Sequence, residues 1–325
     1  MSCCSVTLSV AARWLFKGTD EFKSKEMSLR AKIVGAVIRR VMKKRMANFT
    51  DADEVRSLAS TPAMVVPGDV TVEAAQVAGV AAEWLDSAGG DPTRVILYLH
   101  GGGYVFGGLD SHREIGWRLA KETGRRVLLL DYRLAPEHHF PAPVEDAYAA
   151  YHWLLEQGHA AQQIVVAGDS AGGGLALALA LKLKDEGVTL PEALVLLSPW
   201  ADLTLSGATI DANDSTDVML SRGAVQRFAD IYLNGQDAAH PYASPVLGDL
   251  SGLPRTYVIV GSGEVLRSDS DRLVEGINSA AGQVDIAVWP GMMHVFPIMA
   301  RLIPEGKKAI KNIAQFLDSE KTKAS

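Results

Sequence analysis

The chain has 325 residues, 48% of them hydrophobic, and a formal net charge of −6. This length and composition favour one large α/β domain with a small accessory lobe, or two modest domains, and they argue against global disorder. The acidic balance argues against a nucleic-acid partner, because phosphate-binding surfaces are strongly basic, and it does not favour an acidic membrane surface. The only cysteines are the adjacent Cys3 and Cys4. We therefore expect no disulfide framework and a cytoplasmic location.

The first periodic segment is an amphipathic helix with a basic face, predicted at about residues 26–47. Its apolar positions recur at helical spacing and are Leu29, Ile33, Val37, Val41 and Met42. We expect this stripe to pack on the rest of the protein, and contact with a membrane surface is the alternative. The apolar stretch 6–12 is too short to span a bilayer and no basic residue precedes it, so no stable membrane insertion is predicted.

From about residue 65 onward, short apolar runs alternate with helix-length segments. The runs lie at 95–99, 127–130, 164–167, 193–197, 257–260 and 286–289. The helical segments lie at 116–123, 143–157, 174–185, 221–233 and 269–280. Runs that are apolar at nearly every position are typical of strands buried on both faces of a parallel sheet. The alternation therefore predicts an α/β fold with a mostly parallel, doubly wound sheet.

Residues 168–172 read Gly-Asp-Ser-Ala-Gly and match the pattern G-x-S-x-G. A predicted buried strand leads directly into the motif, and a predicted helix leads directly out of it. A nucleophile elbow requires this strand–turn–helix context, and the glycines permit the tight turn. The alternative is an ordinary Gly-Ser turn that caps the helix. We predict that Ser170 is a nucleophile placed at a helix N-terminus.

A glycine run follows the strand predicted at 95–99 and reads His-Gly-Gly-Gly-Tyr from His100. Acyl transfer needs N–H donors aimed at the oxygen that becomes negative, and glycines supply them without obstructing side chains. We predict an oxyanion hole formed by the N–H groups of Gly102, Gly103 and Ala171, with His100 holding the loop. A flexible turn is one alternative, and a phosphate-binding loop is the other.

Nucleotide binding is not supported by the glycine pattern. The chain contains no G-x-x-x-x-G-K-[ST], and G-x-G-x-x-G fails at its last position when it starts at Gly101, Gly172 or Gly261. We therefore assign no nucleotide-binding residue, and we predict no cofactor-binding and no metal-binding residue elsewhere in the chain.

In folds with such an elbow, the triad runs along the chain in the order serine, acid, histidine. Of eight histidines only His240 and His294 follow Ser170. No suitable strand end precedes His240, whereas His294 lies just after the last predicted strand. A loop at that place can reach the elbow over the carboxyl edge of the sheet. We therefore predict that His294 is the general base.

Three carboxylates compete for the role of the acid. Glu264 lies in the loop directly after the strand predicted at 257–260. Asp269 and Asp271 open the following helix, where acidic residues are favoured for the helix dipole alone. Glu264 has no such structural explanation. We predict that it orients the imidazole and stabilises the imidazolium.

Four motifs together resemble those of the hormone-sensitive-lipase-like esterases, bacterial family IV. In chain order they are HGGGY from His100, DYRLAPE from Asp131, GDSAGG around Ser170 and the late His294. The resemblance covers about residues 65–300. It implies an α/β-hydrolase fold with a helical cap over a catalytic domain at 56–325. The cap is expected from helices within 1–55 and from an insertion after the fifth strand, at about 203–240.

The resemblance also implies hydrolysis of short- to medium-chain carboxylic esters through a Ser-His-Glu triad and an acyl-enzyme, without a cofactor. Members often dimerise through an edge of the sheet, which implies a homodimer. The usual acid block of the family is Asp-Pro-Leu-x-Asp, whereas residues 264–268 read Glu-Val-Leu-Arg-Ser. Glu264 stands where the catalytic aspartate normally stands.

Two other functions remain open at this stage. One is an amidase or peptidase with the same triad. The other is a non-catalytic ligand-binding protein on a hydrolase scaffold, although such proteins tend to lose a triad member and none is missing here. Tyr104 and Trp200 are candidates either for lining the pocket or for the core.

Overall fold

The computed structural model describes residues 27–49, 51–59 and 65–319. Cys3, Cys4 and the stretch 6–12 lie outside these residues. The centre of the molecule is an eight-stranded sheet in the order β1-β2-β4-β3-β5-β6-β7-β8. The strands are β1 (Val70–Val77), β2 (Val80–Ser87), β3 (Asp91–Leu99), β4 (Arg125–Leu130), β5 (Ile164–Asp169), β6 (Ala193–Leu197), β7 (Arg255–Gly261) and β8 (Val284–Trp289).

The strands from β3 to β8 are parallel to one another and contain the six predicted apolar runs. The mostly parallel sheet is therefore confirmed. The hairpin of β1 and β2 is antiparallel and was not predicted. Only the two end residues of β1, Val70 and Val77, are buried. The strand therefore lacks the continuous apolar run that marked the others.

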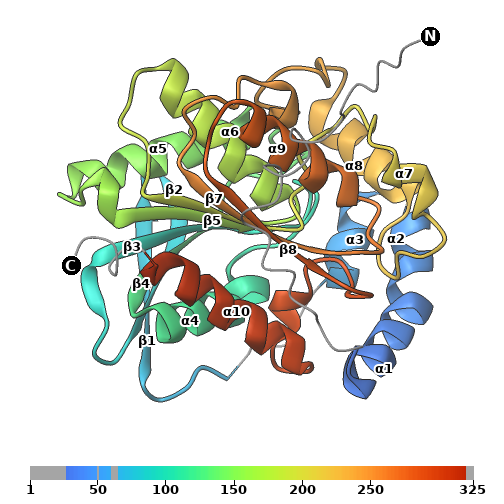
Figure 1. Cartoon of the computed structure of the whole chain (residues 1–325), viewed down its shortest axis with the longest axis horizontal. Coiled ribbons are helices and arrows are strands. Elements are labelled where there is room, and N and C mark those ends of the chain that lie inside the picture. The colour runs from blue at the N-terminus through green and yellow to red at the C-terminus, as the bar shows by residue number, and fades with distance from the viewer. Residues whose placement is uncertain (1–26, 50, 60–64, 320–325) are drawn as a thin grey trace, which may run out of the picture.

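Helices cover both faces of the sheet (Figure 1). They are α4 (Leu109–Thr123), α5 (Ala142–Glu156), α6 (Ala171–Asp185), α9 (Arg267–Ser279) and α10 (Pro304–Asp318). The first four overlap predicted helical segments, whereas α10 was not predicted. In Figure 1, α4 and α10 lie on one face and α5, α6 and α9 on the other. Helix α6 is buried almost throughout, so it forms the centre of its layer.

A second group of helices gathers at one end of the sheet, at the right in Figure 1. It consists of α1 (Leu29–Ile38), the π-helical turn η1 (Arg39–Lys43), α2 (Lys44–Asn48), α3 (Ala52–Ala59), α7 (Thr209–Ala212) and α8 (Arg222–Leu233). The two halves of the group touch, because the ring of Phe49 stacks on that of Phe228 with centroids 4.9 Å apart. The insertion follows β6, the sixth strand, rather than the fifth strand. The run at 193–197 is the fourth predicted one, and the two strands of the hairpin precede it.

The expectation that the apolar stripe of the first helix packs on the protein is wrong for most of its residues. The exposed fractions are 73% for Leu29, 55% for Ile33, 55% for Val37 and 43% for Val41. The helix instead turns the small residues Ala31 and Gly35 inward. A methyl group added at Gly35 would lie 3.8 Å from Met293, so the small residues let the helix backbone approach the domain closely. Of the predicted stripe, only Met42 is partly buried.

The amino edge of the sheet holds a buried ion cluster around Glu192. The guanidinium of Arg125, 1% exposed, donates to the two carboxylate oxygens of Glu192 at 2.7 and 2.8 Å, and Arg255 donates at 3.1 Å. Burial opposes the ionisation of Glu192, but the hydrogen bond and charge of Arg125 outweigh it and lower the pKa of the carboxyl. This cluster joins the first residues of β4 and β7, at the edge opposite the G-x-S-x-G motif.

We expect Glu192→Gln to lower the free energy of unfolding at neutral pH by about 3 kcal/mol, because it leaves the Arg125 charge buried without a carboxylate. The lowered pKa means that this stabilisation is present above the pKa of the unfolded chain. It is lost as the pH falls through the folded-state pKa. The urea midpoints of wild type and variant should therefore converge in acid. Glu156→Gln, at an exposed position of α5, is the control, and an equal loss there would contradict the prediction.

Candidate active site

Ser170 lies at the sharp turn between β5 and α6. Its φ of 52° and ψ of −121° are unusual for a residue with a side chain. The turn is held by a hydrogen bond from the Ser170 amide to the carbonyl of Leu197 at 2.8 Å, and by one from the Trp200 amide to the Ser170 carbonyl at 2.9 Å. A side chain at Gly172 would collide with the carbonyl oxygen of Leu99. The neighbouring backbone thus requires glycine at this position of the motif.

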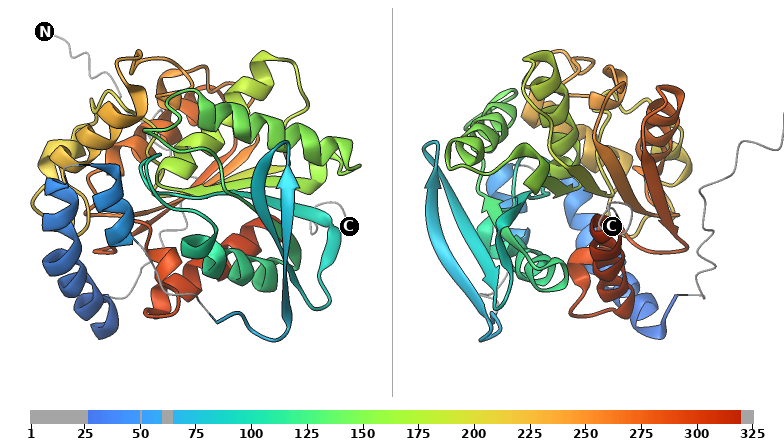
Figure 2. Two further views of the ribbon diagram at one scale, coloured as in Figure 1. Left: turned by 180° about the vertical axis from the view of Figure 1, so that it is seen from behind. Right: turned by 60° about the vertical axis from the view of Figure 1, so that its left-hand side comes forward.

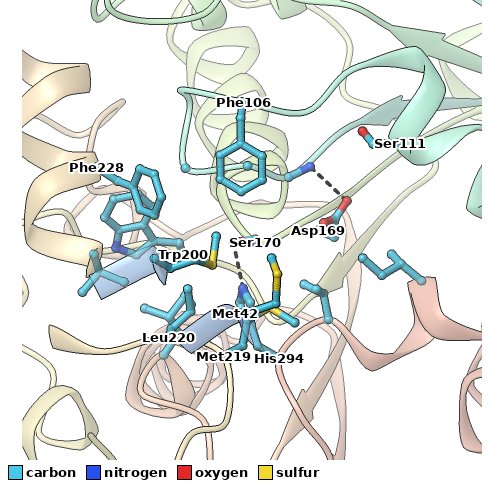
Figure 3. A pocket seen from close by; sticks show the side chains of 18 of the residues that line it. Met42, Phe106, Ser111, Asp169, Ser170, Trp200, Met219, Leu220, Phe228 and His294 are labelled. Atoms are coloured by element: carbon cyan, nitrogen blue, oxygen red, sulfur yellow. Dashed lines mark hydrogen bonds between the residues drawn. The ribbon is translucent and has the colours of Figure 1, made fainter. Parts of the chain in front are cut away.

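The structure brings Ser170, Glu264 and His294 together. Figure 3 shows the hydrogen bond between Ser170 and His294. The Nε2 atom of His294 lies 2.9 Å from the Ser170 hydroxyl, and its Nδ1 atom lies 2.8 Å from Oε2 of Glu264. An ionised carboxylate only accepts, so Nδ1 donates to it, and Nε2 is left to accept the serine proton. The three residues follow β5, β7 and β8, at the carboxyl edge of the sheet. His240, the other histidine considered, packs against the ring of Phe140 instead.

The carboxylate of Glu264 is held by two further donors. Its Oε1 accepts a hydrogen bond from the Ser198 hydroxyl at 2.8 Å and one from the Gly261 amide at 2.5 Å. The Ser198 hydroxyl in turn accepts from the amide of Val295 at 3.1 Å. Ser198 therefore ties the glutamate to the loop that carries His294. Ser198 was not predicted, although its position directly after β6, at the carboxyl edge of the sheet, was a usable signal.

The rival carboxylates have other partners. One oxygen of Asp269 accepts the backbone amides of residues 201 and 202 at 2.9 and 3.0 Å. Asp271 pairs with Arg267 at 2.7 Å. Among the described residues, neither aspartate forms a hydrogen bond with His294. Of the three candidates, Glu264 is the carboxylate beside the imidazole.

The electrostatic surroundings of His294 favour its charged form. The ring is 3% exposed, and burial by itself lowers the pKa of an imidazole. The hydrogen bond and the negative charge of Glu264 act in the opposite direction, with smaller contributions from Asp217 and Asp169. The net effect raises the pKa of His294 above its ordinary value. The environment therefore makes this imidazole a stronger base than a free one.

The glycine loop after β3 is anchored by Asp169, the second residue of the G-x-S-x-G motif. Its buried carboxylate accepts the Gly101 amide at 3.0 Å (Figure 3). It also accepts the Tyr98 hydroxyl at 2.8 Å and lies 3.4 Å from Nε2 of His112. Burial opposes the charge, but His112 and Tyr98 outweigh it and lower the pKa of Asp169. This role of Asp169 was not predicted. The signal available in the sequence was a charged residue in a motif that otherwise consists of small residues.

The anchored loop presents free donors beside the serine. Gly102 has a φ of 125° and Gly103 one of 61°, and among the described residues no acceptor takes either amide. Ala171 is the first residue of α6, where an N–H has no intrahelical partner. His100 is fully buried, and its Nδ1 donates to the Gly101 carbonyl at 2.8 Å. Burial lowers the pKa of His100 to about 3, so its ring is neutral.

A cavity of about 200 Å³ opens above Ser170 and His294. Its apolar walls come from the first helices, the glycine loop, the insertion and the last loop, and are Met42, Met46, Phe106, Trp200, Met219, Leu220, Val225, Leu266, Phe228, Val295 and Ile298. Figure 3 shows Met42, Trp200 and Phe228 around the serine. Trp200 thus lines the cavity, whereas Tyr104 lies in the core and stacks on Tyr232 at 3.9 Å.

The profile of a family described as alpha/beta hydrolase fold matches residues 96–298. The chain is 44% identical to an acetyl-hydrolase of Streptomyces hygroscopicus over 253 residues, which are 78% of this chain and 83% of that protein. A solved esterase of the bacterial hormone-sensitive lipase family is 41% identical with a TM-score of 0.86, over 91% of this chain and 99% of that one. The chain belongs to the hormone-sensitive-lipase-like carboxylesterases.

Membership of this family confirms the resemblance and the α/β-hydrolase fold that the sequence predicted. An esterase of Acinetobacter venetianus is a further relative, 38% identical over 77% of this chain and 82% of that protein. The family match at residues 96–298 covers both the elbow at Ser170 and the late His294.

We expect a histidine NMR titration of this carboxylesterase to give His294 a pKa above about 6.5, the value of an unperturbed imidazole. Glu264→Gln should lower that pKa, because burial then acts without the opposing charge. Asp271→Asn removes a nearby exposed carboxylate that does not touch the ring, and it should leave the titration unchanged. A pKa that does not respond to the loss of Glu264 would contradict the electrostatic account.

Proposed function

We propose that the chain hydrolyses short- to medium-chain carboxylic esters with Ser170 as nucleophile, His294 as base and Glu264 as acid. The observation that carries this proposal is the position of His294, within hydrogen-bond distance of both the serine hydroxyl and the glutamate. Membership of the carboxylesterase family supports the same reaction class.

In the first step the Ser170 hydroxyl oxygen attacks the carbonyl carbon of the ester while Nε2 of His294 takes the hydroxyl proton. The carbonyl electron pair moves onto the oxygen, which becomes an oxyanion. The amides of Gly102, Gly103 and Ala171 donate to this oxygen. Such preformed donors are worth about 10²–10³ in rate for each one removed. Glu264 stabilises the imidazolium through Nδ1.

In the second step the bond between the carbonyl carbon and the alcohol oxygen breaks. His294 gives its proton to the leaving alcohol, and the acyl group stays on Ser170 as an ester. Water then attacks this acyl-enzyme while His294 takes a proton from it. Collapse of the second tetrahedral intermediate releases the acid, and the proton returns to Ser170. The bonds and protons of both steps are accounted for without a cofactor.

We expect Ser170→Ala to lower kcat for p-nitrophenyl butanoate by at least about 10³-fold, because the acyl-enzyme cannot form. A fluorophosphonate should label the wild type at Ser170 and leave the variant unlabelled. Ser279→Ala, an exposed serine at the end of α9, should retain both activity and labelling. Wild-type turnover by the Ser170 variant would end the proposal. Faster turnover of anilides than of esters would favour an amidase instead.

The preference for acyl length follows from the cavity. Its volume of about 200 Å³ is enclosed by apolar side chains of the cap segments, and Phe228, Met219 and Leu220 come from the insertion. An apolar wall favours the burial of methylene groups, and each one contributes about 0.8 kcal/mol as long as it fits. A chain that exceeds the cavity gains nothing further and must displace the cap.

We expect kcat/KM for p-nitrophenyl esters to rise from ethanoate to a maximum between butanoate and octanoate. It should then fall by at least about tenfold at hexadecanoate, because each fitting methylene adds binding and the later ones collide. Assays with monomeric substrate below its aggregation limit measure this directly. A profile that keeps rising to hexadecanoate would contradict the proposed chain length.

We propose further that residues 1–55 and about 203–240 form a cap over a catalytic domain at 56–325. Contacts between α2 and α8 and the walls that both segments give to the cavity support this division. The homodimer and the cytoplasmic location stay predictions. Within the described residues, no helix combines the length and the apolar character that crossing a membrane requires.

A further inference from the structure

The segment from Met27 to Phe49 differs in charge from the rest of the chain. It contains seven lysines and arginines and no aspartate or glutamate, in a chain whose net charge is −6. The acidic total therefore conceals a strongly basic segment. This segment forms α1, η1 and α2.

The outer face of this segment is apolar as well as basic. Leu29, Ile33 and Val37 follow one another at four-residue steps, and all three are more than half exposed. Val41 continues the row on η1 at 43% exposure. In the described part of the chain, no other helix presents a comparable row of exposed large aliphatic side chains. We call these four side chains the outer stripe.

Exposed cations lie among the outer stripe. Arg40 is three residues after Val37, and Lys44 is four residues after Arg40, so helical spacing places both on the same side as the stripe. Arg39 instead donates to the carbonyls of Ser215 and Thr216. It holds the helix to the insertion and leaves Arg40 and Lys44 at the surface.

The position of the outer stripe is open and close to the cavity. Figure 1 and the left view of Figure 2 both place α1 at the outer edge of the molecule. Val41 points outward, whereas the next residue, Met42, lines the cavity above Ser170. One helical rod thus presents the outer stripe on one side and a wall of the cavity on the other.

We propose that the outer stripe and its cations bind the surface of an anionic lipid layer. Aliphatic side chains enter the boundary between headgroups and acyl chains, and exposed Arg and Lys pair with the phosphates, which is how interfacial helices bind. A second copy of the chain fits less well, because a two-fold contact through this face would set against each other two segments that each carry seven cations and no carboxylate. Binding is peripheral, and it does not depend on the esterase activity.

Sedimentation of the full chain with lipid vesicles tests the proposal. We expect binding to vesicles of phosphatidylglycerol and phosphatidylcholine but not to vesicles of phosphatidylcholine alone. Binding should weaken steeply as salt rises to about 0.5 M, because ions screen the headgroup charge. The double variants Ile33→Ser with Val37→Ser, and Arg40→Glu with Lys44→Glu, should each lower the partition coefficient by at least about tenfold.

Matched controls separate this face from the rest of the surface. Lys307 and Lys311 are exposed on α10 at the same four-residue spacing, and their double change to Glu should leave vesicle binding within about twofold. Leu247→Ser with Leu302→Ser, two exposed aliphatic positions elsewhere, should do the same. All variants should keep wild-type turnover of a water-soluble ester, which shows that they fold.

Three outcomes would overturn the proposal. The first is no binding of the wild type to anionic vesicles. The second is an equal loss of binding in the α10 control. The third is a concentration-dependent dimer, seen by sedimentation velocity, that Ile33→Ser with Val37→Ser abolishes while vesicles are not bound. That result would assign the outer stripe to a second copy of the chain.

Discussion

The hydrogen bond between Glu264 and His294 is the interaction on which the site depends. A buried imidazole tends to be neutral and is free to adopt either tautomer. The carboxylate 2.8 Å from Nδ1 fixes the proton there, raises the pKa of the ring and aims Nε2 at Ser170. Because the three residues follow three parallel strands, the sheet brings them to one edge although 124 positions separate serine and histidine.

The fold could be predicted where a strand is buried at every position, because its sequence is then a continuous run of apolar residues. Strands such as β5 and β6 are buried at every position, so their apolar runs identified them. Strand β1 is mostly exposed, and its sequence carries no such run. For the first helix, periodicity showed correctly which residues share a face. It could not show which face meets the protein, because Ala31 and Gly35 pack closely through their small size and carry little hydrophobic signal.

The site was predictable where chemistry demands particular residues in a particular order. The elbow around Ser170, the glycines after β3 and the late His294 could all be named, and Glu264 emerged because Asp269 and Asp271 had a simpler explanation. The supporting residues were not predicted, because their roles depend on distant partners. Asp169 matters through the amide of Gly101, and Ser198 matters through a glutamate 66 positions away. Single motifs do not encode such contacts.

Asp217 joins the insertion to the loop that carries Glu264. Its side chain accepts the amide of Val265, the residue after Glu264, at 2.9 Å, and it also accepts the amides of Met219 and Leu220, which line the cavity. Its carbonyl accepts the ammonium of Lys43 at 2.7 Å. The negative charge of Asp217 also contributes to the raised pKa of His294. Asp217 therefore links the basic segment at residues 27–49, the wall of the cavity and the loop that carries Glu264.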